Sequence, residues 1–260
     1  MRVSRLWSWF WVLLGVLYFF APLYATLLFS LRAQRDTLGF TAYMNVLNDP
    51  RFVSTFLFSL QMAVWTIVVG VVLVAPTVYW VHLRLPNARP FVEMVTMMPF
   101  VVPAVVLVFG LIRTYAPFFT YTFVGRAVLV AGYVVLSLPY MYRAVDTGLR
   151  AIDVRSLTEA AQSLGAGWPT ILLRVILPNL RVALLSGAFL TLAIVIGEYT
   201  MASLLAQPAF GPYMALLGQN RAYEPAALAI MSFALTWSAM GLIQYFGRGR
   251  QQTVELAGTH

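Results

Sequence analysis

Cysteine and lysine are absent from this chain, and histidine is nearly absent. The 260 residues include no Cys and two His, and all 17 basic residues are Arg. A chain without cysteine has no thiol nucleophile, disulfide or iron–sulfur cluster. His82 and His260 are too few for a histidine metal cluster, and without lysine no Schiff base or phosphate-loop lysine can form. We therefore expect a chain that is not an enzyme and binds no metal.

Charge is the second scarcity. Only 10% of the residues are charged, whereas 61% are hydrophobic, and the mean hydropathy is +0.81. Soluble domains are about 45–50% apolar and about 25% charged, so this chain has too little polar surface to cover a globule. The composition predicts a membrane protein. The net charge of +8 then reflects arginines at the membrane edges rather than a nucleic-acid partner.

Six apolar runs are long enough to cross a bilayer, which takes about 20 residues. None shows the sustained alternation typical of a membrane β-barrel. We therefore expect an all-α membrane protein with six transmembrane helices in a single domain, 1–260. The first run is longer than a signal-peptide core and lacks a small-residue cleavage site after it, so we expect it to be retained. The predicted spans are about 7–31, 53–81, 91–112, 126–145, 182–205 and 225–246.

The arginines predict an orientation. If both termini are cytoplasmic, 11 arginines lie on the inner side and 6 on the outer side. Cytoplasmic segments of membrane proteins carry an excess of positive charge, so this split favours cytoplasmic termini. The inner arginines are Arg2, Arg5, Arg84, Arg89, Arg143, Arg150, Arg155, Arg174, Arg181, Arg248 and Arg250; the outer ones are Arg32, Arg35, Arg51, Arg113, Arg126 and Arg221.

The longest inner segment, 146–181, predicts two short helices joined by a sharp turn. Ser156 with Glu159 three residues later is typical of a capped helix start. Gly165–Gly167 ends that helix, and a second amphipathic stretch follows and stops before Pro178. From the pattern alone, such a hairpin either lies on the membrane surface or docks a soluble partner.

The residues of this segment resemble the EAA loop of ABC importer permeases, whose pattern is EAA-x3-G-x9-I-x-LP. Val175 stands where the pattern has Ile. The resemblance implies an importer permease of the type I (MetI-like) architecture, in which this loop is a coupling helix seated in a groove of an ATP-binding subunit. The positions that match the pattern, and that the resemblance assigns to ATPase coupling, are Glu159, Ala160, Ala161, Gly165, Leu177 and Pro178.

The same resemblance implies the partners and the location. Two ATP-binding subunits would hold ATP and Mg²⁺, so this chain would bind no cofactor itself. A second permease, identical or a sister chain, would complete the path, and a periplasmic or extracellular substrate-binding protein would deliver the substrate. The location would be the plasma or inner membrane of a bacterium or archaeon, in contact with lipid. Trp7, Trp9 and Trp11 are interpreted as anchors at the membrane interface.

Glu198 is the most informative acid, because carboxylates deep in a span are costly and usually functional. It either lines the translocation path or makes a buried hydrogen bond to another span or to the partner permease. The segment 197–205, which includes Tyr199, resembles the spermidine/putrescine class of permeases, so we expect a polyamine. The alternatives within the same machinery are iron(III), thiamine, phosphonate and sulfate.

Further path candidates come from the second and third spans. Gln61 lies in a segment where family members often carry Asn before a Ser/Thr-Leu pair, although this chain has Phe58 at that position. Pro99 and Pro103 resemble the paired prolines that open the third span in the family. A secondary transporter is the alternative of a different class, but it would need coupling ions and usually an internal repeat, and no clear repeat is present.

Overall fold

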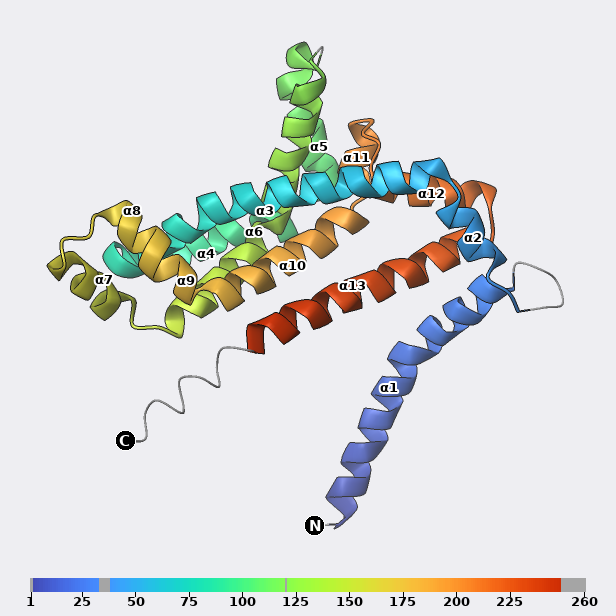
Figure 1. Cartoon of the computed structure of the whole chain (residues 1–260), viewed down its shortest axis with the longest axis horizontal. Coiled ribbons are helices and arrows are strands. Elements are labelled where there is room, and N and C mark those ends of the chain that lie inside the picture. The colour runs from blue at the N-terminus through green and yellow to red at the C-terminus, as the bar shows by residue number, and fades with distance from the viewer. Residues whose placement is uncertain (1, 33–37, 120, 249–260) are drawn as a thin grey trace. The chain divides into compact units, whose positions relative to one another are not determined.

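The computed structural model describes residues 2–32, 38–119 and 121–248, and all regular structure in these ranges is helical (Figure 1). The prediction of an all-α chain is thus confirmed for the described residues. The longer helices are α1 (Arg2–Leu31), α3 (Pro50–Arg84), α6 (Thr122–Arg150), α10 (Arg181–Gly197) and α13 (Glu224–Arg248). The shorter elements are α2 (Thr41–Leu47), η1 (Pro86–Ala88), α4 (Arg89–Met97), η2 (Met98–Phe100), α5 (Ala104–Tyr115), η3 (Ala116–Phe118), α7 (Val154–Ser163), α8 (Trp168–Thr170), η4 (Ile171–Ile176), α9 (Leu177–Asn179), α11 (Thr200–Leu204) and α12 (Phe210–Asn220).

Three described helices, in α1, α3 and α6, are continuous and apolar enough to cross a membrane, and two bent helix pairs raise the number to five. The sixth predicted span coincides with α13, a helix of 25 residues in which Glu224–Leu235 is an apolar segment. The number of six spans and the orientation of the termini therefore remain predictions.

The third predicted span, 91–112, is sharply bent rather than straight. The segments Pro86–Phe100 and Ala104–Phe118 meet at 94°. Pro103 explains the break, because a proline disfavours helical geometry in the residue before it and has no N–H to donate. Its own backbone is extended, with φ −60° and ψ 142°, and it caps α5.

The fifth predicted span, 182–205, is interrupted at both ends. The segments Trp168–Asn179 and Arg181–Gly197 meet at 77°, with Leu180 at the corner. At the other end α10 stops at Gly197, and the short helix α11 follows only after Glu198 and Tyr199. The straight part of this span is thus α10 alone.

The pairing of α6 with α10 forms the centre of the larger compact unit, Thr55–Pro212 with Met240–His260 (Figure 1). Glycines permit the close approach of these helices, as is common between membrane helices. A Cβ at Gly148 would lie 2.6 Å from the Cβ of Ala183, and one at Gly187 would lie 2.8 Å from the sulfur of Met141. The two helices therefore come closest where a glycine of one helix lies against a side chain of the other.

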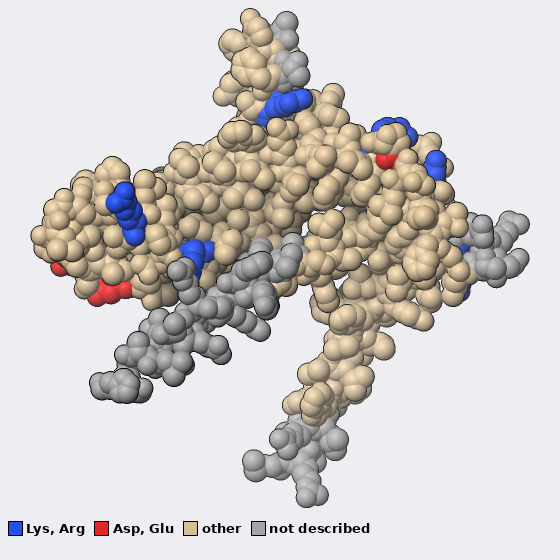
Figure 2. Space-filling view, in the orientation of Figure 1, with Lys and Arg blue, Asp and Glu red and all other residues tan. Residues whose placement is uncertain are grey.

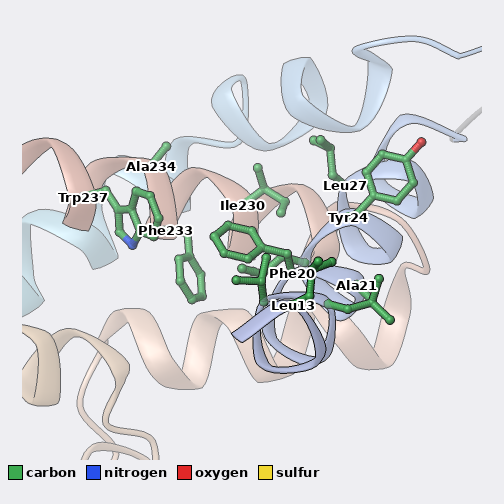
Figure 3. Close-up of a pocket in the computed structure, with 12 residues that line it drawn as sticks. Leu13, Phe20, Ala21, Tyr24, Leu27, Ile230, Phe233, Ala234 and Trp237 are labelled. Atoms are coloured by element: carbon green, nitrogen blue, oxygen red, sulfur yellow. The ribbon is translucent and has the colours of Figure 1, made fainter. Parts of the chain in front are cut away.

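The smaller unit consists of Met1–Ser54 and Tyr213–Ala239. An apolar groove of about 720 Å³ runs between α1 and α13 in this unit (Figure 3). Its described lining includes Leu13 and Phe20 from α1, and Ile230 and Phe233 from α13. Because no charged side chain lines it, the groove suits acyl chains or another apolar helix and has little to recognise a polar solute.

Large apolar side chains cover much of the surface, and the visible face carries few charges (Figure 2). Trp7, Trp9 and Trp11 are 62%, 65% and 54% exposed. A soluble monomer rarely exposes such continuous apolar surface, so these side chains face a non-aqueous environment. Carboxylates on this face lie over α7 and also at a second place away from it, next to arginines (Figure 2).

Candidate functional site

The hairpin, defined as Val154–Asn179, begins one turn earlier than predicted. Asp153, not Ser156, caps α7: its carboxylate accepts hydrogen bonds from the backbone N–H of Ser156 at 3.1 Å and from the Ser156 hydroxyl at 2.7 Å. These bonds, with the side-chain hydroxyl first, lower the pKa of Asp153 from its usual value. The predicted serine cap was wrong because the helix begins earlier: Asp153 caps it by accepting from the N–H of Ser156, so Ser156 lies within the first turn.

The turn that ends α7 lies at the predicted glycine. Gly165 has φ +81°, a left-handed conformation that side chains with a Cβ adopt at a cost of about 1–2 kcal/mol. Its N–H donates to the carbonyl of Gln162 at 2.9 Å, and the N–H of Ala166 donates to the carbonyl of Ala161 at 3.0 Å. This pair of bonds is the Schellman motif. It satisfies the last carbonyls of the helix and exposes the tip.

The predicted coupling residues of α7 divide between two faces. Glu159 and Ala160 are exposed, Ala161 is buried, and Leu164 beside the turn is 88% exposed. Glu159 accepts a hydrogen bond from Arg155 one turn earlier at 3.1 Å, an exposed pair that contributes little to stability. The outer face therefore offers a carboxylate, a small side chain and an apolar side chain to a partner.

The remaining coupling positions lie in the second arm, which is continuous rather than ended by its proline. After the π-helical segment η4, Pro178 begins α9 together with Leu177, where a missing N–H costs nothing. Leu177 packs against the core cluster that includes Ile171, Ile176 and Leu180. The prediction that this arm stops before Pro178 was wrong for that reason.

The inner face of the hairpin is fixed to the end of α3. The Tyr79 hydroxyl and the Thr158 hydroxyl are 2.9 Å apart and both residues are buried. Trp80 and Trp168 meet edge to face with ring centroids 5.3 Å apart, and the Arg84 guanidinium lies 5.8 Å from the Trp168 ring. Both arms of the hairpin therefore contact residues of one helix, so a movement of the hairpin would be passed to α3.

A buried carboxylate joins three helices next to the hairpin. Asp146 of α6 has a side chain only 8% exposed. It lies 2.7 Å from His82 of α3, 2.9 Å from Arg89 of α4 and 2.7 Å from Arg150 of its own helix. A buried charge requires such partners, because an unpaired one costs several kcal/mol. The cluster thereby ties the ends of α3, α4 and α6 together.

Asp146 is the first residue of the predicted inner segment 146–181, and no role was predicted for it. The structure instead extends α6 to Arg150, so Asp146 lies within the helix. An acid flanked by arginines at Arg143 and Arg150 in an otherwise apolar helix was the available signal. The partners on α3 and α4 carry no local sequence signal, because the contact with them is made only by the packing of the helices.

Glu198 serves the backbone of its own segment. Its carboxylate accepts hydrogen bonds from the N–H of Met201 at 3.0 Å and from the N–H of Ala202 at 3.3 Å, and so caps α11. This capping role adds to the two expected roles, a path-lining acid and a bond to another span or to the partner permease, which stay predictions. The chain break explains the capping role: after α10 ends, the free N–H groups of α11 need an acceptor.

The segment after α11 folds back against α10 and α3. A Cβ at Gly211 would overlap the carbonyl oxygen of Glu198, so only glycine permits this approach. The N–H of Phe210 donates to the Ser59 hydroxyl at 2.9 Å, and both residues are buried. These contacts fix the break in place.

The other predicted path residues lie on several elements. Gln61 is exposed on α3, Tyr199 is 48% exposed, and Pro103 is exposed at the bend between η2 and α5, with Pro99 in η2 itself. Among the described residues no hydrogen bond or ion pair joins any two of these five positions. Their assignment to one translocation path therefore stays a prediction.

Metal binding has no support in the described part of the chain, where no three His, Cys, Asp or Glu side chains are grouped as a metal site would need.

Residues 86–252 match the protein family described as "Binding-protein-dependent transport system inner membrane component". The match covers more than half of the chain and includes the hairpin, the Asp146 cluster except for His82, and both ends of α10. The family is thus assigned on the region that carries the candidate site.

Similar proteins include three transport permeases. The methionine import system permease protein MetP of Bacillus subtilis is 30% identical over 110 residues, 42% of this chain and 49% of that protein. The probable sulfate transport system permease protein cysT of Chlorella vulgaris is 31% identical over 164 residues, 58% of this chain and 60% of that protein. The spermidine/putrescine transport system permease protein PotC of Escherichia coli is 26% identical over 204 residues, 74% of each chain. The chain thus spans about half the length of the first of these relatives.

Two solved structures share the fold. An amino acid ABC transporter solved with histidines has a TM-score of 0.56 at 18% identity, over 79% of this chain and 97% of that one. A bacterial ABC transporter involved in the import of the acidic polysaccharide alginate has a TM-score of 0.67 at 13% identity, over 94% of this chain and 97% of that one. At such low identity these likenesses establish the architecture alone.

Proposed function

This chain belongs to the binding-protein-dependent transport system inner membrane component family, and we propose that it docks an ATP-binding subunit through the outer face of the hairpin. The chain is accordingly a permease of an ABC importer and an inner-membrane protein, and the secondary-transporter alternative is removed. In the proposed assembly two ATP-binding subunits bind ATP and Mg²⁺, a second permease completes the path, and a substrate-binding protein delivers the solute from outside. This chain itself performs no catalysis.

One observation carries the docking proposal: the hairpin is fixed on one face and free on the other. Its inner face is held by Tyr79 and by the apolar cluster around Ile171, whereas Ala160 and Leu164 project outward and Glu159 pairs with Arg155 on the same exposed face. A rigid, solvent-facing helix with small and charged side chains suits a protein groove better than a lipid surface. When ATP closes the two ATPase subunits, the hairpin would move with its groove and shift α3 and α6.

The experiment is to replace Gly165 with Asp. The substitution adds a charge to the tip, whereas no atom of the described residues, apart from its chain neighbours, lies within 4 Å of the added Cβ. We expect uptake and the stimulation of ATP hydrolysis by the binding protein to be abolished, with normal insertion in the membrane. Gly165→Asn is the matched control, because Asn tolerates this conformation and adds no charge, and should retain much of the stimulation. Normal uptake by Gly165→Asp would overturn the proposal.

A polyamine substrate has one specific support, the similarity to PotC over 74% of the chain. MetP and cysT are named for methionine and sulfate, so the relatives as a group do not favour one solute. The expected role of Glu198 in binding a cation is now less persuasive, because its carboxylate caps α11. If Glu198→Gln leaves spermidine uptake unchanged, the remaining residue-based argument for a polyamine is lost while the permease assignment stands.

A further inference from the structure

A second groove lies between α6 and α10 and differs in chemistry from the groove of Figure 3. Its volume is about 740 Å³. Tyr140, Arg143 and Thr147 line it from α6, one helical turn after another, and Ser186 lines it from α10. Asn179, at the end of the hairpin, lies at its margin. A face of a membrane helix that carries an arginine and several hydroxyl and amide groups does not face acyl chains, because burying them in lipid is costly.

Arg143 gives the groove its charge. Its side chain is exposed and forms no ion pair or hydrogen bond with another described residue. The neighbouring acid, Asp146, is already occupied by His82, Arg89 and Arg150. No carboxylate of the described residues lines the groove. The net charge that a solute would meet there is therefore positive.

The groove also has a direction. At one end lie Ala151 and Ile152, where the chain leaves α6 for the hairpin, and Asn179, where the hairpin ends before α10. The other end is more apolar and is lined by Phe100, Pro139 and Leu190. The hairpin-side end of the groove, its mouth, therefore lies between the residues at which the hairpin begins and ends. A displacement of the hairpin would widen or narrow this mouth, which connects the groove to the ATPase-docking element.

We infer that this groove is the hairpin-side vestibule of the translocation path and that Arg143 makes it selective for anionic solutes, such as carboxylates or oxyanions. The inference rests on the proposed permease function and deepens it by naming the class of solute. A guanidinium binds carboxylate and oxyanion groups through paired N–H donors, and the hydroxyls of Thr147 and Ser186 and the Asn179 amide would complete the contacts. A polyamine would be repelled by the same charge.

The absence of cysteine permits a direct test, since Ser186→Cys introduces a single thiol into the groove. The permease with its ATP-binding subunit is placed in phosphatidylcholine nanodiscs, which carry no net lipid charge. The thiol is then modified with an anionic reagent, sulfonatoethyl methanethiosulfonate, and with a cationic one, trimethylammonioethyl methanethiosulfonate. The rates are compared with Arg143 present and in Arg143→Gln. A unit charge acting through water over about 8 Å changes the local concentration of a univalent ion roughly twofold, in opposite directions for the two reagents.

We expect the ratio of anionic to cationic modification rates to fall about fivefold in Arg143→Gln and to be restored in Arg143→Lys. Arg174→Gln, which removes an exposed arginine of the hairpin outside the groove, is the matched control and should leave the ratio unchanged. A thiol that reacts with neither reagent would mean that lipid or the second permease fills the groove and would overturn the inference. So would a ratio that is insensitive to Arg143. ATP hydrolysis, measured on the same samples, reports on the docking proposal separately.

Discussion

The two ends of α10 are both broken, but they are held in different ways. At the hairpin end, beyond the 77° corner at Leu180, side chains from several helices make the contacts: Asp146 joins α3, α4 and α6, and Tyr79 reaches Thr158. At the other end, Glu198 caps α11 within its own segment, the Ser59 hydroxyl of α3 accepts a hydrogen bond from the N–H of Phe210, and the remaining contacts are apolar.

This difference shows where movement can be transmitted. A junction built from side chains of three helices passes a displacement of the hairpin on to all of them, because breaking a buried ion pair is costly. A junction held by capping bonds, one hydrogen bond to α3 and apolar packing has no described buried ion pair to break, so it should resist a displacement less strongly. Variants that remove the contacts of one end at a time therefore show which contacts join helices to one another and which only hold a local segment.

The largest effect is expected from Asp146→Ala. It leaves His82 and Arg89 without their buried partner, and since Arg150 is 54% exposed we place the loss at about 3 kcal/mol, the lower part of the range for breaking such a pair. Thermal unfolding in detergent measures it. Glu159→Ala, which removes only an exposed pair with Arg155, should change stability by well under about 1 kcal/mol. Equal effects of the two variants would contradict the role given to the cluster.

An intermediate effect is expected at the other end from Gly211→Ala. The new methyl group would overlap the backbone of Glu198, and overpacking of this kind costs about 1–3 kcal/mol. Gly197→Ala serves as its control, because no atom lies within 4 Å of the position its Cβ would take and its φ is not in the left-handed region. The same unfolding assay applies, and a Gly211→Ala protein as stable as Gly197→Ala would show that the close approach does not exist.

The smallest effect is expected from Asp153→Asn, and only at certain pH values. Hydrogen bonds lower the folded-state pKa of Asp153, so its contribution is complete above the unfolded pKa of about 3.9 and is lost as the pH falls through the lower folded value. Asn keeps the cap but not the charge. The wild type should be slightly more stable than the variant at neutral pH, and the difference should vanish on acidification. A difference that grows towards acid pH would reverse the assigned sign.

The helical class, the hairpin and its glycine turn could be predicted from sequence because their signals are local. Apolar runs report the spans, and Gly165 is the residue type that a left-handed turn requires. The helix start was predicted about one turn too late, since Asp153 and Ser156 are both of capping type and the sequence does not say which of them begins the helix.

The breaks and the buried cluster could not be predicted in the same way. The capping role of Glu198 could not be predicted, because its sequence position says nothing of α10 ending one residue before it. The partners of Asp146 come from helices more than 50 residues away in the sequence, as the separation of 57 residues from Arg89 shows. Arg143 was used only to orient the chain, whereas the groove it lines exists only once α6 and α10 are packed.

The docking claim is tested most directly by site-specific cross-linking to the ATP-binding subunit. Because the chain has no native cysteine, Ser163→Cys places one thiol on the exposed end of α7 and Thr114→Cys places one on the exposed end of α5. Each is labelled with a photoactivatable benzophenone maleimide in membranes that contain the assembled transporter. We predict a cross-link to the ATP-binding subunit from the Ser163→Cys protein and none from the Thr114→Cys protein. A cross-link from Thr114→Cys alone, or from neither variant in an assembly that hydrolyses ATP, would contradict the assignment of the hairpin as the docking element.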